Sequence, residues 1–333
     1  MKNSKEIYGS YQNKPVTKYS LENENGTKLS VLDYAGIWQE YSFKGHNLLL
    51  QPKTFDNFTD NPFFIGRIVG RTSGRIGDSK LLLNGKEITI PSNEGTTNLH
   101  GGPNGIHSHF LDATVHENSI TLSRIQKSQE DGFPGDLDFS VTYTLFEDDS
   151  VSLTFQGTQL NEDGVFNPTS HTYWNLADEQ DNILDHSLQI LSTKHLQLDD
   201  KSVPNGEYVQ NANSGFDFAK STTIATNIDK LQHGIDDVFV IDEHDDNTPI
   251  AILKDNKSNR ELSIYSPQNG LVVFTAEPIN EELTFVNGQG QAYNGIALES
   301  HNLPNPDKYP QFGSDKLAKN ETKEITLTYK IKE

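Results

Sequence analysis

The sequence predicts an all-β protein, a large antiparallel sandwich of two sheets with few short helices. Apolar and polar residues alternate with a period of two in several segments, as half-buried strands require. β-Branched and aromatic residues dominate these runs, and Gly, Asn and Asp separate them. No long helical pattern alternates with the strands, which argues against a parallel α/β sheet.

The clearest strand covers residues 137–145, where Leu, Phe, Val, Tyr and Leu alternate with Asp, Ser and Thr. The acidic stretch 147–150 reads as a hairpin turn, and the alternation resumes over 151–155. Residues 325–331 repeat the same pattern near the C-terminus. Each of these segments is expected to place one apolar face against a core.

Helical signals are few and short. Asn227–Gly234 predicts one or two turns with Gly234 at the C-cap, and Thr54–Asp60 is a similar candidate. No internal repeat and no Pro/Gly/Ser-rich linker divides the chain. With 333 residues, one third of them apolar, we expect residues 1–333 to form a single β domain.

Charge and composition exclude several classes of function. Lys and Arg number 27 against 47 Asp and Glu, a net charge of −20, which disfavours nucleic acid and anionic membrane surfaces as partners. The chain has no cysteine, so disulfides, thiolate metal sites and cysteine nucleophiles are excluded. No apolar run is long enough for a transmembrane helix or a signal peptide, and we expect a cytoplasmic protein.

Two histidines stand out by their neighbours. His100 precedes Gly101 and Gly102, and two glycines allow a backbone to approach a ligand closely, although a plain glycine turn is the alternative. His171 lies in the segment 169–175, and in a strand it would share a face with Tyr173 and Asn175. Such a polar and aromatic face is typical of a sugar pocket, or of a structural polar cluster.

Charged residues occupy three further motifs. Arg71 and Arg75 lie four apart among small residues, where a guanidinium can reach hydroxyl groups or form an ion pair. Asp236 and Asp237 together lie between apolar residues, where an acid can bind a ligand or cap a turn. Glu299 ends an apolar run, and a carboxylate at a buried strand end is either paired for structure or poised for catalysis.

A metal site is the less favoured interpretation. His107 and His109 share one face of a possible strand, and Asp112, His116 and Glu117 follow. Their spacing does not match the pattern that cupin-type sandwiches use, and two histidines alone rarely make a site. We therefore expect no metal.

Seven motifs, in one order between about residues 30 and 330, together resemble the aldose 1-epimerase (galactose mutarotase) family. The family's two-sheet sandwich agrees with the alternation described above. The matching segments are Gly70-Arg71-Thr72-Ser73-Gly74-Arg75-Ile76, Leu99-His100-Gly101-Gly102, Gly132-Phe133-Pro134-Gly135, Ser170-His171-Thr172-Tyr173-Trp174-Asn175-Leu176, Pro204-Asn205-Gly206-Glu207, Gly234-Ile235-Asp236-Asp237 and Leu298-Glu299-Ser300-His301-Asn302-Leu303-Pro304.

The resemblance implies a cofactor-independent mutarotase that interconverts the α and β anomers of galactose or glucose. It implies Glu299 as general base at the anomeric hydroxyl and His171, carrying its proton, as general acid at the ring oxygen. His100 is expected to hydrogen-bond one of those oxygens. The sugar hydroxyls are then held by Arg71, Asp236, Asn98 and Asn175. Trp174 is a candidate to cover the sugar face, although its position in a strand can point it away from His171.

Several positions depart from the family pattern. Thr97, Gly74 and Ser170 stand where family members often carry Asn. In the same way Trp174 replaces Phe, Asp237 replaces His and His301 replaces Gln. These changes bear on the preferred sugar rather than on the reaction, because the charged and imidazole positions are intact.

Other functions remain open at this point. They are a maltose mutarotase, a non-catalytic sugar-binding module, a hexose-6-phosphate epimerase, which would need a basic clamp, and a glycoside hydrolase with two carboxylates. The expected partner is a small sugar, and the protein is expected to be a monomer or a homodimer.

Overall fold

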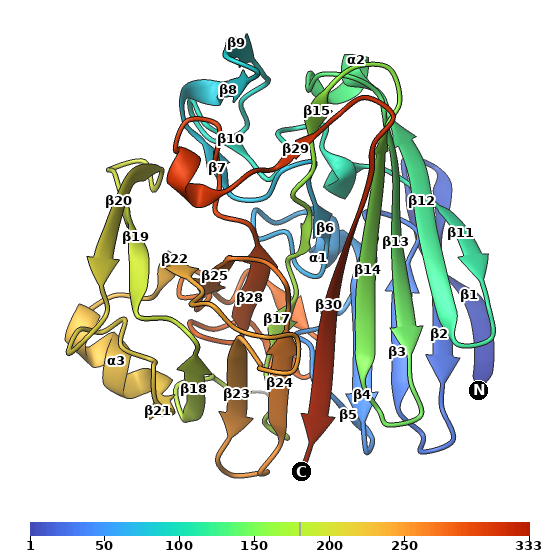
Figure 1. Cartoon of the computed structure of the whole chain (residues 1–333). Coiled ribbons are helices and arrows are strands. Elements are labelled where there is room, and N and C mark those ends of the chain that lie inside the picture. Colours follow the sequence, from blue (N-terminus) through green and yellow to red (C-terminus); the bar gives the residue numbers. More distant parts are fainter. Residues whose placement is uncertain (180) are drawn as a thin grey trace.

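The computed structural model describes residues 1–179 and 181–333, and most of its strands lie in two packed layers of antiparallel sheet (Figure 1). The first layer is one sheet of nine strands, with the order β11 (Asp112–Val115), β12 (Ser119–Gln126), β13 (Leu137–Leu145), β14 (Val151–Gln159), β30 (Thr322–Lys332), β24 (Glu261–Tyr265), β23 (Ala251–Asp255), β18 (His186–Ile190) and β21 (Thr222–Thr223).

The second layer consists of two sheets. A five-stranded sheet runs β1 (Lys2–Tyr11), β2 (Lys14–Glu22), β3 (Lys28–Leu32), β4 (Trp38–Phe43) and β5 (His46–Asn47). A six-stranded sheet runs β17 (Tyr173–Trp174), β28 (Ile296–His301), β25 (Gly270–Phe274), β22 (Asp236–Val240), β19 (Lys194–Leu198) and β20 (Pro204–Gln210).

Backbone hydrogen bonds join these two sheets edge to edge. The Leu50 N–H donates to the Tyr173 carbonyl and the Asn175 N–H donates to the Leu48 carbonyl, both at 2.9 Å. The second layer is therefore continuous across the molecule, and the predicted two-layer β-sandwich is confirmed.

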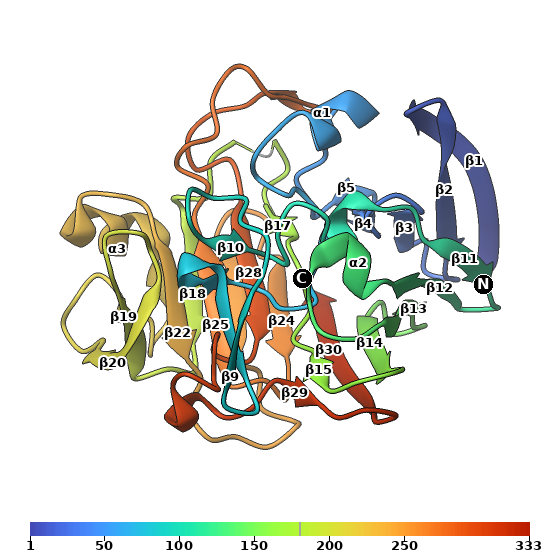
Figure 2. The ribbon, with the colours of Figure 1, turned by 90° about the horizontal axis from the view of Figure 1, so that it is seen from above.

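Five short ribbons lie outside the layers. They are β6 (Ile68–Val69) with β16 (Thr169–Ser170), β7 (Arg75–Ile76) with β10 (Asn98–Leu99), β8 (Lys80–Leu83) with β9 (Lys86–Thr89), β15 (Gly164–Val165) with β29 (Lys316–Leu317), and β26 (Thr284–Phe285) with β27 (Gly288–Gln289). Figure 1 places β7 to β10 at the upper end of the six-stranded sheet, and Figure 2 shows them over β28, β25 and β22. They close one end of the sandwich, where the candidate site lies.

The predicted strands form at the predicted positions. Residues 137–145 are β13, the hairpin turn at 147–150 leads into β14, and the C-terminal alternation is β30. Tyr143 pairs with Leu153, which pairs in turn with Leu327, and all three side chains are buried. The polar residues between them point to the solvent side of the sheet. The alternation of apolar and polar residues therefore arises from one buried face and one solvent-facing side, as predicted.

The core between the layers is rich in aromatic rings. Trp38 stacks on Tyr41 with ring centroids 5.5 Å apart, and it meets Trp174 and Tyr329 edge-on at 5.4 Å and 5.1 Å. Burying each such side chain contributes on the order of 1.5–3 kcal/mol. Trp174 is thus a core residue, and it faces away from His171 as its strand position allowed.

The helices are short, as expected. In α1 (Phe55–Thr59) the N-cap is Thr54, whose hydroxyl accepts from the Asn57 N–H at 3.3 Å, so this candidate is confirmed. The helix α3 (Ile224–Leu231) begins three residues before the predicted start and ends at Gln232, which is left-handed, rather than at Gly234. The described residues contain one further helix and three 3₁₀ turns, namely α2 (Ser128–Asp131), Gly77–Ser79, Ile106–Ser108 and Pro310–Phe312.

In the two ranges that the structure describes, no helix combines the length and the apolar character that crossing a membrane requires.

Gly157 in β14 tests how tightly this core is packed. A Cβ atom at this position would lie 2.5 Å from the ring of Phe166, a distance that real side chains do not tolerate. We expect Gly157→Ala to lower the free energy of unfolding by about 1–3 kcal/mol, because the ring has to shift. Urea denaturation measures the change.

A smaller residue at position 166 provides the control. Combining Gly157→Ala with Phe166→Leu should cost less than the sum of the two single changes, because the new methyl group then has room. Additive costs would show that the two residues do not clash.

Candidate active site

The floor of the candidate site is one face of the six-stranded sheet. Glu299 in β28 lies opposite Val272 in β25, and Val272 lies opposite Val238 in β22. In the next row Phe274 lies opposite Asp236. Residues directly opposite one another project from the same face of a sheet, and all five line a cavity of about 310 Å³. Cross-strand register therefore brings two carboxyl groups to one pocket.

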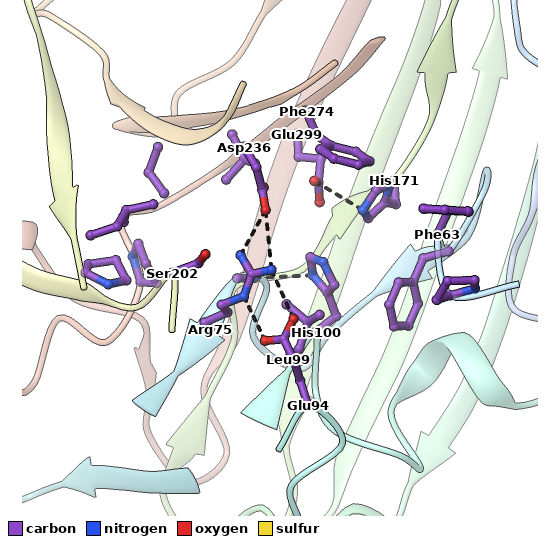
Figure 3. A pocket seen from close by; sticks show the side chains of 18 of the residues that line it. Phe63, Arg75, Glu94, Leu99, His100, His171, Ser202, Asp236, Phe274 and Glu299 are labelled. Carbon is purple, nitrogen blue, oxygen red and sulfur yellow. Dashed lines mark hydrogen bonds and ion pairs between the residues drawn. The ribbon is translucent and has the colours of Figure 1, made fainter. Parts of the chain in front are cut away.

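His171 reaches the same pocket from the break between β16 and β17. Its N–H donates to the Arg67 carbonyl at 2.8 Å, and its carbonyl accepts from the Gly66 N–H at 2.9 Å. The side chain projects so that Nε2 lies 3.3 Å from Oε1 of Glu299 (Figure 3). The two side chains are only 7% and 2% exposed, so the contact is almost entirely shielded from bulk water.

Aromatic contacts fix the plane of the His171 ring. Nearly parallel rings pack against it, with centroid distances of 5.9 Å to Phe64 and 5.2 Å to Tyr173. Its Nδ1 has no hydrogen-bond partner on another described residue, although such a bond is the usual means of orienting an imidazole. Phe64 adopts φ 50°, which is unusual for a bulky residue, and this conformation brings its ring to the site.

His100 is held beside His171 by hydrogen bonds to Gly74. The His100 N–H donates to the Gly74 carbonyl at 3.1 Å, and the Gly74 N–H donates to His100 Nδ1 at 3.4 Å. Because Nδ1 accepts, a neutral His100 carries its proton on Nε2. The two imidazole rings meet edge-on, with centroids 5.1 Å apart.

The glycines after His100 serve the backbone and not a ligand. A Cβ atom on Gly101 would lie 2.1 Å from the Gly70 carbonyl oxygen, and one on Gly102 would lie 2.5 Å from the Asn98 side chain. Only glycine fits at either place. The Gly-Gly pair therefore allows the His100 loop to pack on the Arg71 segment, which agrees with a glycine turn rather than with a close approach to a ligand.

Burial determines the charges of the acid/base pair. It raises the pKa of Glu299 well above its ordinary value, and the neighbouring Asp236 adds to this rise. It also depresses the pKa of His171, because an imidazolium would lose its hydration. The free pocket therefore favours a neutral imidazole, in contrast to the protonated His171 that the family resemblance implied.

Arg75 forms the wall opposite the acid/base pair. Its Nε and Nη2 donate to the two carboxylate oxygens of Glu94 at 2.8 Å and 3.1 Å. Its Nη1 and Nη2 also lie 3.4 Å from Oδ2 of Asp236. Both carboxylates line the cavity, and their side chains are 41% and 42% exposed, so one guanidinium organises the polar side of the pocket (Figure 3).

The prediction that Arg71 binds the sugar is wrong. Its side chain is 0% exposed, with Nε 2.7 Å from Oδ2 of Asp131 and Nη1 3.0 Å from the Pro134 carbonyl. The guanidinium has no route to the cavity, because the 131–135 loop covers it. Arg75 takes the predicted place four residues later, since the ribbon of β7 and β10 sets it opposite Leu99 at the pocket.

Neither predicted asparagine lines the cavity. Asn98 donates from Nδ2 to the Pro91 carbonyl at 2.6 Å, and Asn175 donates from Nδ2 to the Asn294 carbonyl at 2.8 Å. Both are 0% exposed, so these two predictions of sugar contact are also wrong. Asn175 shares no pocket face with His171, because the chain is irregular between β16 and β17.

Sequence reasoning missed Glu94 and Phe64. Glu94 follows no recognisable motif, and only its pairing with Arg75 reveals it. Phe64 lies just before the Gly70-Arg71 motif, and no periodicity marks it. The remaining predicted residues, Glu299, His171, His100 and Asp236, meet in one pocket as expected.

His107 and His109 do not form the metal pair that we considered. His107 packs against Phe64, and His109 hydrogen-bonds through Nε2 to the Asn104 carbonyl. Within the described residues, the one group of potential ligand atoms is His100, His171 and Glu299, which lie within 4.8 Å of one another. The absence of a metal stays a prediction.

Comparison with known proteins identifies the family. The family model described as aldose 1-epimerase matches residues 17–330. The chain belongs to the aldose 1-epimerase family. It is 34% identical to a maltose epimerase from Levilactobacillus brevis over 99% of this chain and 98% of that protein. It is 33% identical to an aldose 1-epimerase from Streptococcus thermophilus over 96% of this chain and 95% of that protein.

Solved structures agree with the family fold. An aldose epimerase homologue from C. elegans superposes with a TM-score of 0.87 at 25% identity, covering 94% of this chain and 98% of the other. A galactose 1-epimerase from Lactobacillus acidophilus gives the same TM-score at 24% identity, covering 99% and 98%. The fold assignment thus has support independent of the motifs.

Replacing Arg71 and replacing Arg75 are expected to lower the stability of the protein by different amounts. Arg71→Met should lower the free energy of unfolding by about 3–5 kcal/mol, because it leaves Asp131 buried without its partner. Arg75→Met should cost much less stability, because Glu94 and Asp236 can return to water. Chemical denaturation of the two variants measures the difference, and equal losses would contradict this division of roles.

His186, which lies outside the cavity, tests the effect of burial on an imidazole. It accepts the Leu176 N–H at Nε2, and burial lowers its pKa to about 4. Below about pH 6.5 the unfolded chain binds a proton at His186 and the folded chain does not. The free energy of unfolding therefore falls as the pH drops below 6.5. From pH 7 to pH 5, the wild type should lose about 2 kcal/mol relative to His186→Gln.

Exposed His116 supplies the matched control for that experiment. His116→Gln should follow the wild type at both pH values, because the side chain of His116 is exposed to water in the folded chain as it is in the unfolded chain. Urea denaturation at each pH gives the free energies. If His186→Gln also follows the wild type, burial does not disfavour the imidazolium at this site.

Proposed function

We propose that this pocket interconverts the α and β anomers of a hexose, with Glu299 as general base and His171 as general acid. The observation that supports the proposal is the 3.3 Å contact between Glu299 Oε1 and His171 Nε2 in a cavity open to a small ligand. Opening a pyranose requires a proton off O1 and a proton onto O5, and these oxygens share the carbon C1. A base and an acid in direct contact suit that pair of atoms.

In the proposed ring opening and ring closure, atoms and protons balance without a cofactor. Glu299 takes the proton of the O1 hydroxyl, the C1–O1 bond becomes a carbonyl, and the C1–O5 bond breaks. His171 gives its proton to O5, so the ring opens to an aldehyde. After rotation about C1–C2, the O5 hydroxyl attacks the other carbonyl face, returning its proton to His171 while Glu299 reprotonates O1. The catalyst ends in the state in which it began.

The reactive state needs one proton on the pair, and that proton has to be on His171. Burial favours the neutral forms in the free pocket, with the proton on Glu299. A bound sugar changes the balance, because its O1 hydroxyl donates to a carboxylate and its O5 accepts from an imidazolium. The 3.3 Å contact allows the proton to cross directly within the pair.

The other polar groups hold the sugar in place. Arg75 and Asp236 are suited to bind ring hydroxyls through charge-assisted hydrogen bonds, in place of Arg71. His100 carries its Nε2 proton into the pocket, where it can donate to O1 or O5. Fixing the pose in this way lowers the entropic cost of reaching the transition state.

Two alternatives differ in substrate or in chemistry. A disaccharide mutarotase is favoured by the relative named maltose epimerase. A sugar-binding module without catalysis is less favoured, because pure binding does not require a base facing an acid. A cytoplasmic location, a monomeric or dimeric state and independence of cofactors stay predictions from the sequence.

Polarimetry tests the reaction directly. Freshly dissolved α-glucose, α-galactose and maltose should each approach their equilibrium rotation faster with the protein than without it, over the spontaneous rate in the same buffer. If the protein accelerates the equilibration of none of these sugars but calorimetry detects sugar binding, the non-catalytic binding module is favoured instead.

Glu299→Gln tests the base. The amide keeps the shape of the side chain but cannot accept the O1 proton, so kcat should fall by about 10²–10⁴-fold while sugar affinity changes little. The control is Glu324→Gln on the exposed side of β30, which should leave kcat unchanged. Full activity of Glu299→Gln would exclude Glu299 as the base.

A further inference from the structure

Arg67 is a buried cation that the mechanism above does not use. The residue is 7% exposed, and it does not line the cavity. Its Nη2 donates to the carbonyl oxygens of Phe58 and Thr59, the second at 3.3 Å, at the C-terminal end of α1. The last carbonyls of a helix have no partner within the helix, and a cation is favourable there. These contacts hold the guanidinium in one place.

No contacting carboxylate balances the charge of Arg67. In the described part of the chain no Asp or Glu forms an ion pair with this guanidinium, and its Nε has no hydrogen-bond partner there. Asp60, at the C-cap of α1, attracts it only from a greater distance. A guanidinium stays protonated in a protein. Arg67 therefore differs from Arg75, whose charge is balanced by Glu94 and Asp236.

A single aromatic ring lies next to both Arg67 and His171. The guanidinium carbon is 6.0 Å from the centroid of the Phe64 ring, and the imidazole of His171 stacks on the same ring at 5.9 Å. The Arg67 carbonyl also accepts the His171 N–H at 2.8 Å, so the backbone keeps the two residues together. Buried charges are screened much less than exposed ones. Burial lowers the pKa of His171 to about 3, and the charge of Arg67 adds to this effect.

The other groups around His171 do not supply an unbalanced charge. Burial lowers the pKa values of His100, His107 and His301, so these imidazoles are neutral near pH 7. Arg75 acts in the same direction as Arg67, but two carboxylates offset it. The charged and titratable groups on the elements packed around His171 are Glu299 and His301 on β28, Asp236 on β22, Arg75 on β7, Tyr173 on β17, His100 after β10, His107 in the turn Ile106–Ser108, and Arg67.

The acid/base pair needs one proton, and a second proton would stop the reaction. Burial keeps a proton on Glu299 in the free pocket. If His171 then gains a proton as well, no group is left to accept the proton of O1. This doubly protonated state forms as the pH falls through the pKa of His171. A positive charge near the imidazole disfavours it, because two positive charges repel each other.

We propose that Arg67 is a positioning residue for the reaction, because its unpaired charge, held behind Phe64 by the end of α1, keeps a second proton off Glu299 and His171. It extends activity toward acidic pH without touching the sugar. This inference rests on the proposed function, since the proton count of the pair matters only if the pair transfers protons.

Neutral and charged replacements of Arg67 test the role of its charge. Arg67→Gln keeps an N–H donor for the α1 carbonyls and removes the charge, and a unit charge about 10 Å away shifts a pKa by about one unit. The imidazolium then forms more easily, so the acidic limb of kcat/KM for glucose, measured by polarimetry, should move up by about one pH unit. Arg67→Lys should keep the wild-type limb. Coincident profiles of Arg67→Gln and the wild type, down to the lowest pH at which both stay folded, would overturn the proposal.

NMR titration of the His171 ring is a readout that does not depend on activity. The pKa of His171 should rise by about one unit in Arg67→Gln, or in Arg67→Met if the amide variant does not fold. The control Lys332→Gln removes the same charge at the opposite end of the molecule from the pocket, and should leave this pKa unchanged (Figure 1). Equal pKa values in the wild type and the neutral variant would overturn the proposal. A shifted pKa in a protein that accelerates no sugar would instead overturn the proposed function, and the role of Arg67 with it.

Discussion

The contact between a carboxyl group and an imidazole, 3.3 Å apart and shielded from water, is the constraint on which the rest of the pocket depends. Each partner alone would carry a large desolvation cost if charged. Together they can hold one proton between them, and the ring stacking on His171 and the strand register of Glu299 keep them in reach. The acid/base pair is therefore positioned by a row of the sheet and by an aromatic stack, whereas His100 comes from a loop.

The fold was largely predictable because its signal is local. Alternation over residues 137–145 and 325–331 needs only a buried face to be correct, and both segments are central strands of the nine-stranded sheet. The start of α3 was less predictable, because Ile224 is held by packing against the core rather than by a capping residue. The joining of the two sheets of the second layer at Leu50 had no local signal at all.

The site was predictable where chemistry and motif coincide, as at Glu299 and His171. It was not predictable where two residues of the same type lie close together in the sequence and only one of them lines the pocket. Arg71 and Arg75 each follow a glycine in the same short motif, and only the tertiary partner Asp131 decides which guanidinium is structural. Asn98 and Asn175 look like sugar ligands by residue type, but each meets a backbone carbonyl first. Buried backbone groups require partners, and a motif does not reveal which side chain supplies them.

The ion pairs of Arg75 with Glu94 and Asp236 affect how strongly sugar binding depends on salt. The guanidinium is held in place before any sugar arrives, so binding does not have to freeze a long flexible side chain. A neutral hexose also leaves the charge of the pocket as it was. Affinity for the sugar should consequently depend little on ionic strength, so that dissolved salts would neither favour nor hinder its binding.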